Sequence, residues 1–214
     1  MKAPSTPTTP ATAGRPKDPV KRQAILNAAK RLFLSNGYDG SSMDAIAAEA
    51  GVSKLTVYSH FSDKETLFTA AVKSKCAEQL PRPMFEPSAD ASIESVLLTI
   101  GRGFHNLVNS PEAIKLLRLM AAQANLDSKL SLLFLDAGPL SVMREMQRLL
   151  TQANQQQQLQ INDPTKAAEH FFSLIKGNDN FRLLIGCSAE LQNPAAIEAH
   201  IQDVVELFLR AYRT

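Results

Sequence analysis

Apolar residues recur every three or four positions through most of this chain, which is the spacing of one face of an α-helix. No segment alternates strictly between apolar and polar residues as a half-buried strand would. The pattern therefore predicts an all-α protein. Ten helices are expected, over residues 19–36, 42–49, 53–60, 63–80, 91–108, 111–124, 127–136, 139–156, 164–187 and 194–212.

Capping residues mark where several of these helices begin. Four times, a side chain that caps helices stands directly before a proline, which suits the first helical position because that position needs no N–H. The four pairs are Asp18-Pro19, Ser110-Pro111, Asp163-Pro164 and Asn193-Pro194. Ser41 and Asp44 have the spacing of a capping box, which predicts the start of one more helix.

The segments between the helices are rich in proline or polar residues. Three prolines within residues 81–87 break the chain after the fourth helix. Residues 1–13 are dominated by proline, threonine and alanine, so we expect a disordered tail. Five glutamines lie within residues 155–160. They fit either a solvated helix end or a polar tract that binds a partner.

Residues 41–64 have the spacing of a helix-turn-helix. This motif needs a small residue where its two helices cross, a glycine four positions later and an aliphatic residue six positions after that. Ala47, Gly51 and Val57 stand at these positions. Apolar residues fill the other inward positions, namely Ile46, Ala50, Val52 and Phe61, and the outward or flanking positions hold Lys54, Leu55, Thr56, Tyr58 and Ser59. A second helix with such a face enters the major groove of DNA.

With these residues the chain resembles the tetracycline-repressor (TetR) family of bacterial transcription regulators. The similar segments are Gly14-Arg15-Pro16, Ala24 to Ala29, Phe33, Gly37-Tyr38, Ser42 to Ala47, Gly51-Val52-Ser53, Tyr58 to Phe61 and Lys64 to Phe68. The resemblance implies a DNA-binding domain over residues 14–64, a connecting helix over 63–80, and a ligand-binding and dimerisation domain over 81–214. The competing interpretation is an incidental pair of amphipathic helices with Gly51 as an ordinary helix cap.

Base recognition is expected at the start of the second helix, because this end reaches the base edges in helix-turn-helix complexes. Lys54 suits guanine O6 and N7, Leu55 suits a thymine methyl group, and Thr56 suits either a donor or an acceptor. For these and the other outward residues, a plain solvent-facing side chain is the competing interpretation.

Contacts with the DNA backbone are expected around this helix. Tyr58 and His60, with Ser59 between them, resemble a family segment whose tyrosine and histidine touch the backbone. Ser42 suits a phosphate through its hydroxyl and the helix-terminal N–H groups, and Lys64 suits one through its charge.

Basic charge concentrates near the motif although the net charge is only +2. Residues 1–80 carry 11 Lys and Arg against 7 Asp and Glu, whereas the remainder carries 12 against 14. Neutralising phosphates releases counterions and gives affinity for any DNA sequence. Arg15 and Lys17 resemble family arms that enter the minor groove, which suits arginine.

The C-terminal two-thirds resembles the family mainly in architecture. Residues 171–179 and 181–184 are similar to the AefR-like C-terminal class, whose last two long helices form a four-helix dimer interface. Apolar residues with helical spacing make up the predicted interface: Leu174, Leu184, Ile197, Ile201, Val204, Val205, Phe208 and Leu209. Ordinary intrachain core is the competing interpretation for each. A homodimer would read a palindromic operator with half-sites about one DNA turn apart.

A ligand cavity between the middle helices is also implied by the resemblance. Such cavities are mostly apolar and have few polar anchors. The predicted lining is Phe104, His105, Met120, Gln123, Phe134, Met143, Phe171, Ile175 and Asn178, with Leu107, Leu116 and Met146 as further candidates. The family mechanism implies a repressor that a small, apolar ligand releases from DNA. The alternative is a constitutive or partner-controlled DNA-binding regulator without a ligand.

Other classes of protein lack support in the sequence. No Walker loop, HExxH, GxSxG or complete GxGxxG motif is found, which argues against an enzyme. The four histidines are scattered, so neither a metal nor a cofactor is expected. Cys76 and Cys187 lack CxxC spacing, and no signal peptide or long apolar run is found, which favours a reducing, cytoplasmic setting without a membrane. Both cysteines are interpreted as small buried residues rather than oxidant sensors.

Overall fold

The computed structural model describes residues 18–88, 90–123, 128–187 and 193–212, apart from the side chains of Gln123 and Ser128. Within these ranges the chain forms ten α-helices and one 3₁₀-helix, and no β-strand, so the predicted all-α fold is confirmed. The helices are α1 (Pro19–Asn36), α2 (Met43–Glu49), α3 (Lys54–His60), α4 (Lys64–Gln79), η1 (Arg82–Phe85), α5 (Ile93–Asn109), α6 (Pro111–Gln123), α7 (Ser128–Ala137), α8 (Pro139–Gln155), α9 (Pro164–Leu184) and α10 (Pro194–Tyr212). The predicted tail over residues 1–13 lies outside the described residues.

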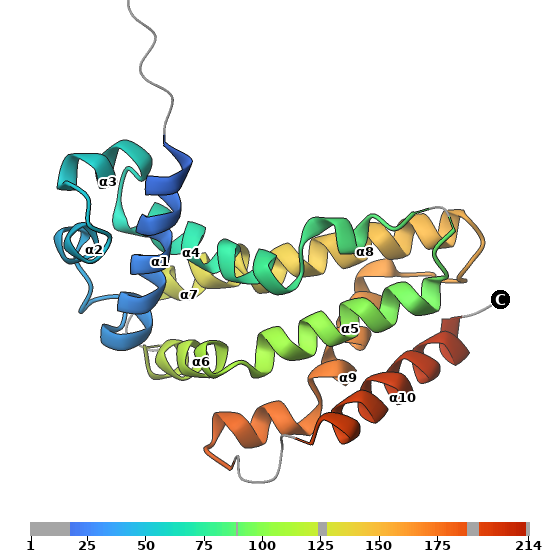
Figure 1. Cartoon of the computed structure of the whole chain (residues 1–214). Coiled ribbons are helices and arrows are strands. Elements are labelled where there is room, and N and C mark those ends of the chain that lie inside the picture. The colour runs from blue at the N-terminus through green and yellow to red at the C-terminus, as the bar shows by residue number, and fades with distance from the viewer. Residues whose placement is uncertain (1–17, 89, 124–127, 188–192, 213–214) are drawn as a thin grey trace, which may run out of the picture.

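The helices are arranged as a small head and a larger bundle (Figure 1). Helices α1, α2 and α3 gather at one end, and α4 leads from this head along α7 toward the other helices. One hydrophobic cluster joins the head to Met120, Leu130 and Ala137 of α6 and α7, and a second fills the bundle formed by α5, α8, α9 and α10. None of the described helices combines the length and apolarity needed to cross a membrane.

All four predicted caps before a proline are confirmed. A side-chain oxygen of Asp18, Ser110, Asp163 or Asn193 accepts a backbone N–H from the first turn of the following helix, over 2.9 to 3.2 Å. These bonds satisfy N–H groups that have no partner within the helix. The local sequence therefore fixes where α1, α6, α9 and α10 begin.

The start of α2 differs from the prediction. Ser42 is the cap, and its Oγ accepts the Ala45 N–H at 3.1 Å. Ser41 is buried instead, and its hydroxyl donates to the Gly37 carbonyl oxygen at 2.7 Å. The predicted capping box of Ser41 with Asp44 was therefore wrong, because the chain enters α2 one residue later.

The proline-rich segment after α4 and the glutamine-rich segment after α8 also have structural roles. Phe85 of η1 is buried in the bundle core, so the proline-rich segment contributes packing as well as a break. The glutamines that follow α8 are exposed, which confirms their interpretation as a helix end and loop. Beyond them, the Gln160 N–H donates to the Tyr212 carbonyl oxygen at 2.7 Å, which ties this loop to the end of α10.

Helix α9 is interrupted at Gly177, whose φ of +58° and ψ of −170° lie outside the helical region. This conformation is essentially restricted to glycine. The Nε2 of His200, on α10, lies 3.1 and 3.2 Å from the carbonyl oxygens of Leu174 and Ile175, just before the interruption. The predicted continuous helix over 164–187 was wrong here and at its end, because α9 stops earlier.

Helix α10 turns its main apolar face into the chain. Five residues of the predicted dimer interface are buried in the bundle core, namely Ile201, Val204, Val205, Phe208 and Leu209. Ile197 packs against the same core and is partly buried. For these six residues the intrachain-core interpretation applies, because α5 and α9 already cover this face. Of the predicted α9 pair, Leu174 is exposed and Leu184 is half-buried.

Candidate nucleic-acid interface and ligand cavity

The turn between α2 and α3 depends on Gly51. Its φ is +66°, in the left-handed region, and no atom of the described residues lies within 4 Å of the place that a Cβ would take. Backbone conformation rather than space therefore favours glycine here. Ala47 and Val57 are buried where the two helices meet, and Phe61 is buried just after α3. The predicted helix-turn-helix packing is confirmed.

The outer face of α3 is open to solvent. Leu55 is 79% exposed and Tyr58 is 43% exposed, and Ser59 beside them is exposed as well. Leu55 therefore gains little from the fold of its own chain, and Tyr58 keeps a large part of its side chain in contact with solvent. This face is therefore available for contact with another molecule.

Lys54 begins α3 and pairs with Asp44 of α2. Its Nζ lies 2.8 Å from one carboxylate oxygen and 3.0 Å from the other. The hydrogen bond and the charge of Asp44 raise the pKa of Lys54. Both side chains are more exposed than buried, so the pair is screened by water and weak. A phosphate or a guanine can therefore replace Asp44 as the partner of Lys54. This pairing of Asp44 with Lys54 was not predicted from the sequence.

Thr56 and Ser59 make hydrogen bonds within α3. The Oγ of Ser53 caps the helix by accepting the Thr56 N–H at 3.1 Å, and it lies 2.8 Å from Thr56 Oγ1. The Ser59 hydroxyl donates to the Thr56 carbonyl oxygen at 2.7 Å. Thr56 thus stabilises the start of α3 in the free protein. If its hydroxyl also contacted a base, it would have to do so while hydrogen-bonded to Ser53 Oγ, or give up that bond.

Lys64 fastens the segment between α1 and α2. Its Nζ donates to the carbonyl oxygens of Tyr38 and Ser41 at 2.9 and 3.1 Å, and it lies 4.1 Å from the centroid of the Tyr38 ring. The ammonium group is therefore already engaged. These contacts are those of a structural residue rather than of the phosphate ligand predicted from the sequence.

Ser42 and His60 stand at helix ends in the head. The cap at Ser42 uses its oxygen as acceptor, so the hydroxyl hydrogen is left for a phosphate. His60 lies against Phe61, and its Nδ1 is buried without a hydrogen-bond partner in the described part of the chain. A backbone contact by His60 would therefore involve Nε2.

Two basic residues predicted for the minor groove, Arg15 and Lys17, lie outside the described residues.

Arg22 of α1 is a further basic residue near the motif, and it was not predicted as a DNA contact. Its guanidinium carbon lies 5.1 Å from the centroid of the Phe61 ring, which places an exposed positive charge beside the end of α3. The cluster of basic residues in α1 was the sequence signal that included it.

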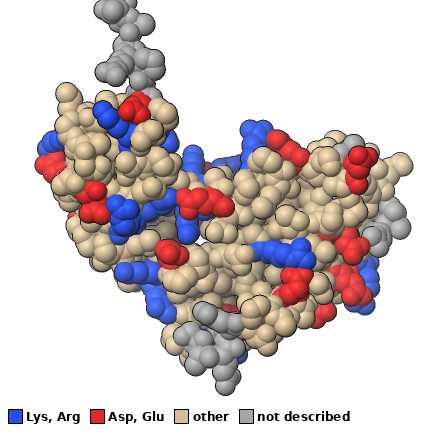
Figure 2. Space-filling view, viewed as in Figure 1, with Lys and Arg blue, Asp and Glu red and all other residues tan. Residues whose placement is uncertain are grey.

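A cavity of about 620 Å³, called the junction cavity below, lies where the head meets the bundle. Helices α1 and α4 to α9 all contribute to its wall. Figure 2 shows basic and acidic side chains around a hollow in this region. The volume is typical of a small-molecule site.

The wall of the junction cavity contains part of the predicted ligand set. Phe104 and Phe134 line it, together with Leu107 and Leu116. The other predicted residues with described side chains, which do not line it, are His105, Met120, Met143, Met146, Phe171, Ile175 and Asn178. Most of these pack in the two cores instead. The side chain of Gln123 lies outside the described part.

Several wall residues were missed by the sequence analysis. Lys176, Asn180 and Leu184 of α9 line the cavity, and Leu184 had been predicted for the dimer interface. Asn180 and Leu184 are four positions apart beyond the interruption at Gly177, so they share a face of α9, and Lys176 stands just before the interruption. That spacing was the signal that could have found them.

His105 was predicted as a polar anchor for a ligand. The structure buries its side chain in the bundle, and its Nδ1 has no hydrogen-bond partner among the described residues. Burial, followed by the charge of His200, lowers the pKa of His105. The ring is therefore neutral at physiological pH.

The two cysteines differ in their surroundings. Cys76 lines the junction cavity, and burial raises the pKa of its thiol to about 11. A thiol that stays protonated is a poor nucleophile, which agrees with the interpretation as a small apolar residue. Cys187 is exposed beyond the end of α9, so for this residue the prediction of burial was wrong.

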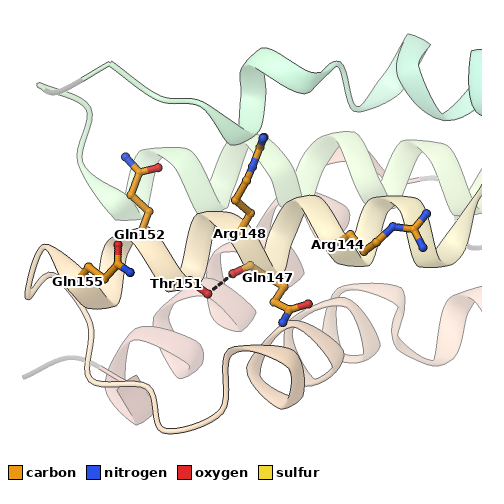
Figure 3. A pocket seen from close by; sticks show the side chains of 6 residues that line it. All are labelled: Arg144, Gln147, Arg148, Thr151, Gln152 and Gln155. Atoms are coloured by element: carbon orange, nitrogen blue, oxygen red, sulfur yellow. Dashed lines mark hydrogen bonds between the residues drawn. The ribbon is translucent and has the colours of Figure 1, made fainter.

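A second hollow lies along the outer face of α8 (Figure 3). All six side chains that line it come from this one helix, so no other element converges on it. Arg144 is paired with Asp136, and Arg148 is paired with Glu86 and Glu145. The positive charges of this hollow are thus already balanced by acidic residues of the protein. The junction cavity is therefore the better candidate for a ligand.

Comparison with known families agrees with this geometry. The family of bacterial regulatory proteins called the tetR family matches residues 25–71. The AefR-like transcriptional repressor C-terminal domain matches residues 95–214, which is more than half of the chain. The chain belongs to the TetR family.

Solved structures of regulatory proteins share the fold over almost the whole chain. A TetR-family transcriptional regulator from Mesorhizobium loti is 30% identical, with a TM-score of 0.75, over 91% of this chain and 97% of that chain. The flavonoid-responsive regulator FrrA is 31% identical, with a TM-score of 0.70, over 90% of this chain and 97% of FrrA.

Among curated proteins, the match covers a shorter part. The HTH-type transcriptional regulator YdeS of Bacillus subtilis (strain 168) is 32% identical over 118 residues, which are 55% of this chain and 57% of YdeS. The chain therefore spans little more than half the length of this relative. Like the protein from Mesorhizobium loti, YdeS is named as a transcriptional regulator.

Proposed function

We propose that this TetR-family chain is a homodimeric repressor that binds a palindromic operator through α3 and is released by a small ligand in the junction cavity. The main support for DNA binding is the outer face of α3. It presents an exposed leucine, an exposed tyrosine and a lysine held by a weak, replaceable ion pair. Apolar, aromatic and cationic groups of this kind recognise thymine methyl groups, the DNA backbone and guanine.

A second copy of the chain is needed because one helix-turn-helix reads only half of a palindrome. The buried face of α10 is unavailable for this contact. We place the contact on the remaining apolar surface of the last two helices, which comprises Leu174, Phe181, Ile185 and Leu207, each 39% to 59% exposed. Sedimentation of the purified protein at micromolar concentration is expected to give a dimer. A strictly monomeric species would contradict this part of the proposal.

Release by a ligand is supported by the position of the junction cavity. Its wall includes Lys30 and Leu34 of α1 and Phe68 of α4, which belong to the head or its connection. A ligand that fills the cavity therefore touches the head and the bundle at once. If it binds better to a conformer with wrongly spaced heads, the population shifts to that conformer and operator affinity falls.

Selection from a random duplex library tests the proposal. The purified protein is incubated with the library at near-physiological salt, which screens non-specific phosphate binding, and the retained duplexes are sequenced. We expect a palindrome with half-sites about one turn apart. Recovery of no motif from demonstrably folded protein would refute operator recognition by the free protein.

A further inference from the structure

The wall of the junction cavity combines an apolar surface with an excess of positive charge. From this combination we infer that the ligand is an anionic amphiphile, with a carboxylate or similar acid group held by Lys176 and an apolar body in the cavity. The inference rests on the proposed function, because it names the chemical class of the ligand that releases the repressor.

The apolar body of the ligand would lie against side chains from six helices, α1 and α4 to α8. These wall residues are Phe33, Phe68, Phe104, Leu107, Leu116, Phe134 and Val142. A cavity of about 620 Å³ is large enough for a medium-length hydrocarbon chain or a small set of aromatic rings. Burial of such a body supplies most of the binding free energy, since the gain grows with the apolar area removed from water.

The charged residues of the wall do not balance. Four are basic, namely Lys30, Arg31, Lys75 and Lys176, whereas Glu78 and Glu112 are the two acids. Lys30 pairs with Glu78, and Lys75 lies 3.7 Å from Glu112. Arg31 pairs with Glu49, which stands outside the wall. The wall therefore favours an anionic ligand over a neutral or cationic one.

Lys176 is the basic wall residue that best fits the role of anchor. Among the described residues it has no ion pair, in contrast to the other three wall cations. It stands directly before the interruption of α9 at Gly177, and Asn180 lines the cavity on the other side of that interruption. An unpaired ammonium group at the edge of an apolar cavity is suited to a carboxylate that keeps contact with water.

The polar surroundings of Asn180 leave one donor unused. Its Nδ2 donates to the Val108 carbonyl oxygen and to Asn109 Oδ1, each at 3.0 Å. The Nδ2 of Asn109 is buried and has no hydrogen-bond partner among the described residues. Val108 and Asn180 both belong to the cavity wall. Asn109 itself does not line the cavity, so the case for an anionic ligand rests on the charged residues of the wall.

Two probes of equal chain length, one with an anionic and one with a neutral head group, test the inference. Decanoate and decanol are titrated separately into the full chain without DNA, and the binding constants are measured by calorimetry. We expect decanoate to bind roughly tenfold more tightly than decanol, which corresponds to one charge-assisted contact. Equal binding of the two probes, or binding of neither, would overturn the assignment of an anionic ligand.

Substitution of the anchor tests the position of the acid group. Lys176→Ala is expected to weaken decanoate binding about tenfold and to leave decanol binding within about twofold. Lys115→Ala is the matched control, because Lys115 is an exposed lysine on α6 that does not line the cavity. An equal effect of both variants on decanoate would overturn the role of Lys176.

A third variant tests whether the probes occupy the junction cavity. Leu116→Trp should fill part of the cavity and weaken both probes, and circular dichroism checks that its helicity is unchanged. Undiminished decanoate binding in this folded variant would overturn the location. Because all titrations are made without DNA, their failure is distinct from a failure of operator recognition, which the duplex selection measures on its own.

Discussion

Helix α3 and the junction cavity present their recognition groups in opposite ways. The groups on α3 come from one short segment, residues 54–60, and point outward from a head whose core is complete without them. The wall of the cavity is assembled from seven helices, with residues from Asn27 to Leu184. Recognition on a surface thus depends on one rigid element, whereas recognition in an interior depends on how distant elements pack.

This difference predicts where substitutions act. On α3 a substitution should change DNA affinity and leave stability intact, because the outward side chains pack against little. In the bundle, the residues that line the cavity and the residues that form the core lie on the same helices. A substitution of a core residue that neighbours the wall should therefore lower the free energy of unfolding.

Phe171→Ala should have the largest effect. The side chain is fully buried, and its ring packs 5.3 Å from the Phe208 ring and 5.6 Å from the Phe172 ring, measured between centroids. We expect the free energy of unfolding to fall by about 3–5 kcal/mol, measured by denaturant titration. Leu132→Ala is the control, because this α7 leucine is 64% exposed. Similar losses of stability in both variants would break the distinction between buried core and exposed surface.

The double variant Lys54→Ala with Tyr58→Ala should affect DNA alone. We expect roughly hundredfold weaker binding to the selected duplex, about 2.7 kcal/mol, with the helicity and the melting temperature unchanged. Fluorescence anisotropy with labelled duplex measures the affinity. Lys166→Ala removes a distant lysine that is also ion-paired, with Glu169, and should leave DNA binding unaltered. Retained specific binding by the double variant would refute the assignment of α3.

Gly177→Ala should strain the interruption of α9. The glycine has a conformation that side chains rarely adopt, and an added Cβ would lie 3.2 Å from the Nε2 of His200. We expect a loss of about 1–3 kcal/mol in the free energy of unfolding. Ser173→Ala, an exposed position on the same helix, serves as the control. A stability equal to that of this control would show that α9 can run straight through residue 177.

Asp63→Ala should have the smallest effect of the four. Asp63 caps α4 by accepting the Thr66 N–H at 2.7 Å, and this bond lowers the pKa of its carboxyl group below the ordinary 3.8. We expect a loss of about 1 kcal/mol near neutral pH. A carboxylate with a lowered pKa stabilises the fold above its unfolded pKa, and that stabilisation disappears as the pH falls through the folded pKa.

The pH dependence gives this prediction its control. The difference in unfolding free energy between the wild-type chain and Asp63→Ala should shrink as the pH falls below about 4, whereas Asp63→Asn keeps the cap without titrating. Urea titrations at several pH values measure it. A difference that does not change with pH would show that the charge of Asp63 contributes nothing to the cap.

The head was predictable from sequence because its structure is encoded locally. Gly51 and Val57 have fixed offsets within one motif, and the cap of α1 at Asp18 lies next to the residues that it stabilises. Even here, the contacts of Lys64 were missed, because its partners Tyr38 and Ser41 lie more than twenty positions earlier in the chain.

The cavity and the dimer surface were less predictable because they depend on tertiary packing. Helical spacing shows that Val204 and Phe208 share a face of α10, but it does not show whether that face meets α5 and α9 or a second chain. In the same way, Phe171 and Phe104 are both apolar and close in space to Phe172, yet only Phe104 lines the cavity. The choice between core and wall is made by the arrangement of several helices.

The wall that joins α1 and α4 to the bundle also sets how such a regulator responds to concentration. If a ligand in the junction cavity lowers operator affinity by some factor, operator DNA lowers the affinity for that ligand by the same factor, since the two couplings are one free energy. Protein already on DNA then senses the ligand less readily than free protein does. The ligand concentration that triggers release is therefore higher for a strong operator than for a weak one. As the ligand concentration rises, a single pool of protein would leave its weak operators first and its strong operators last.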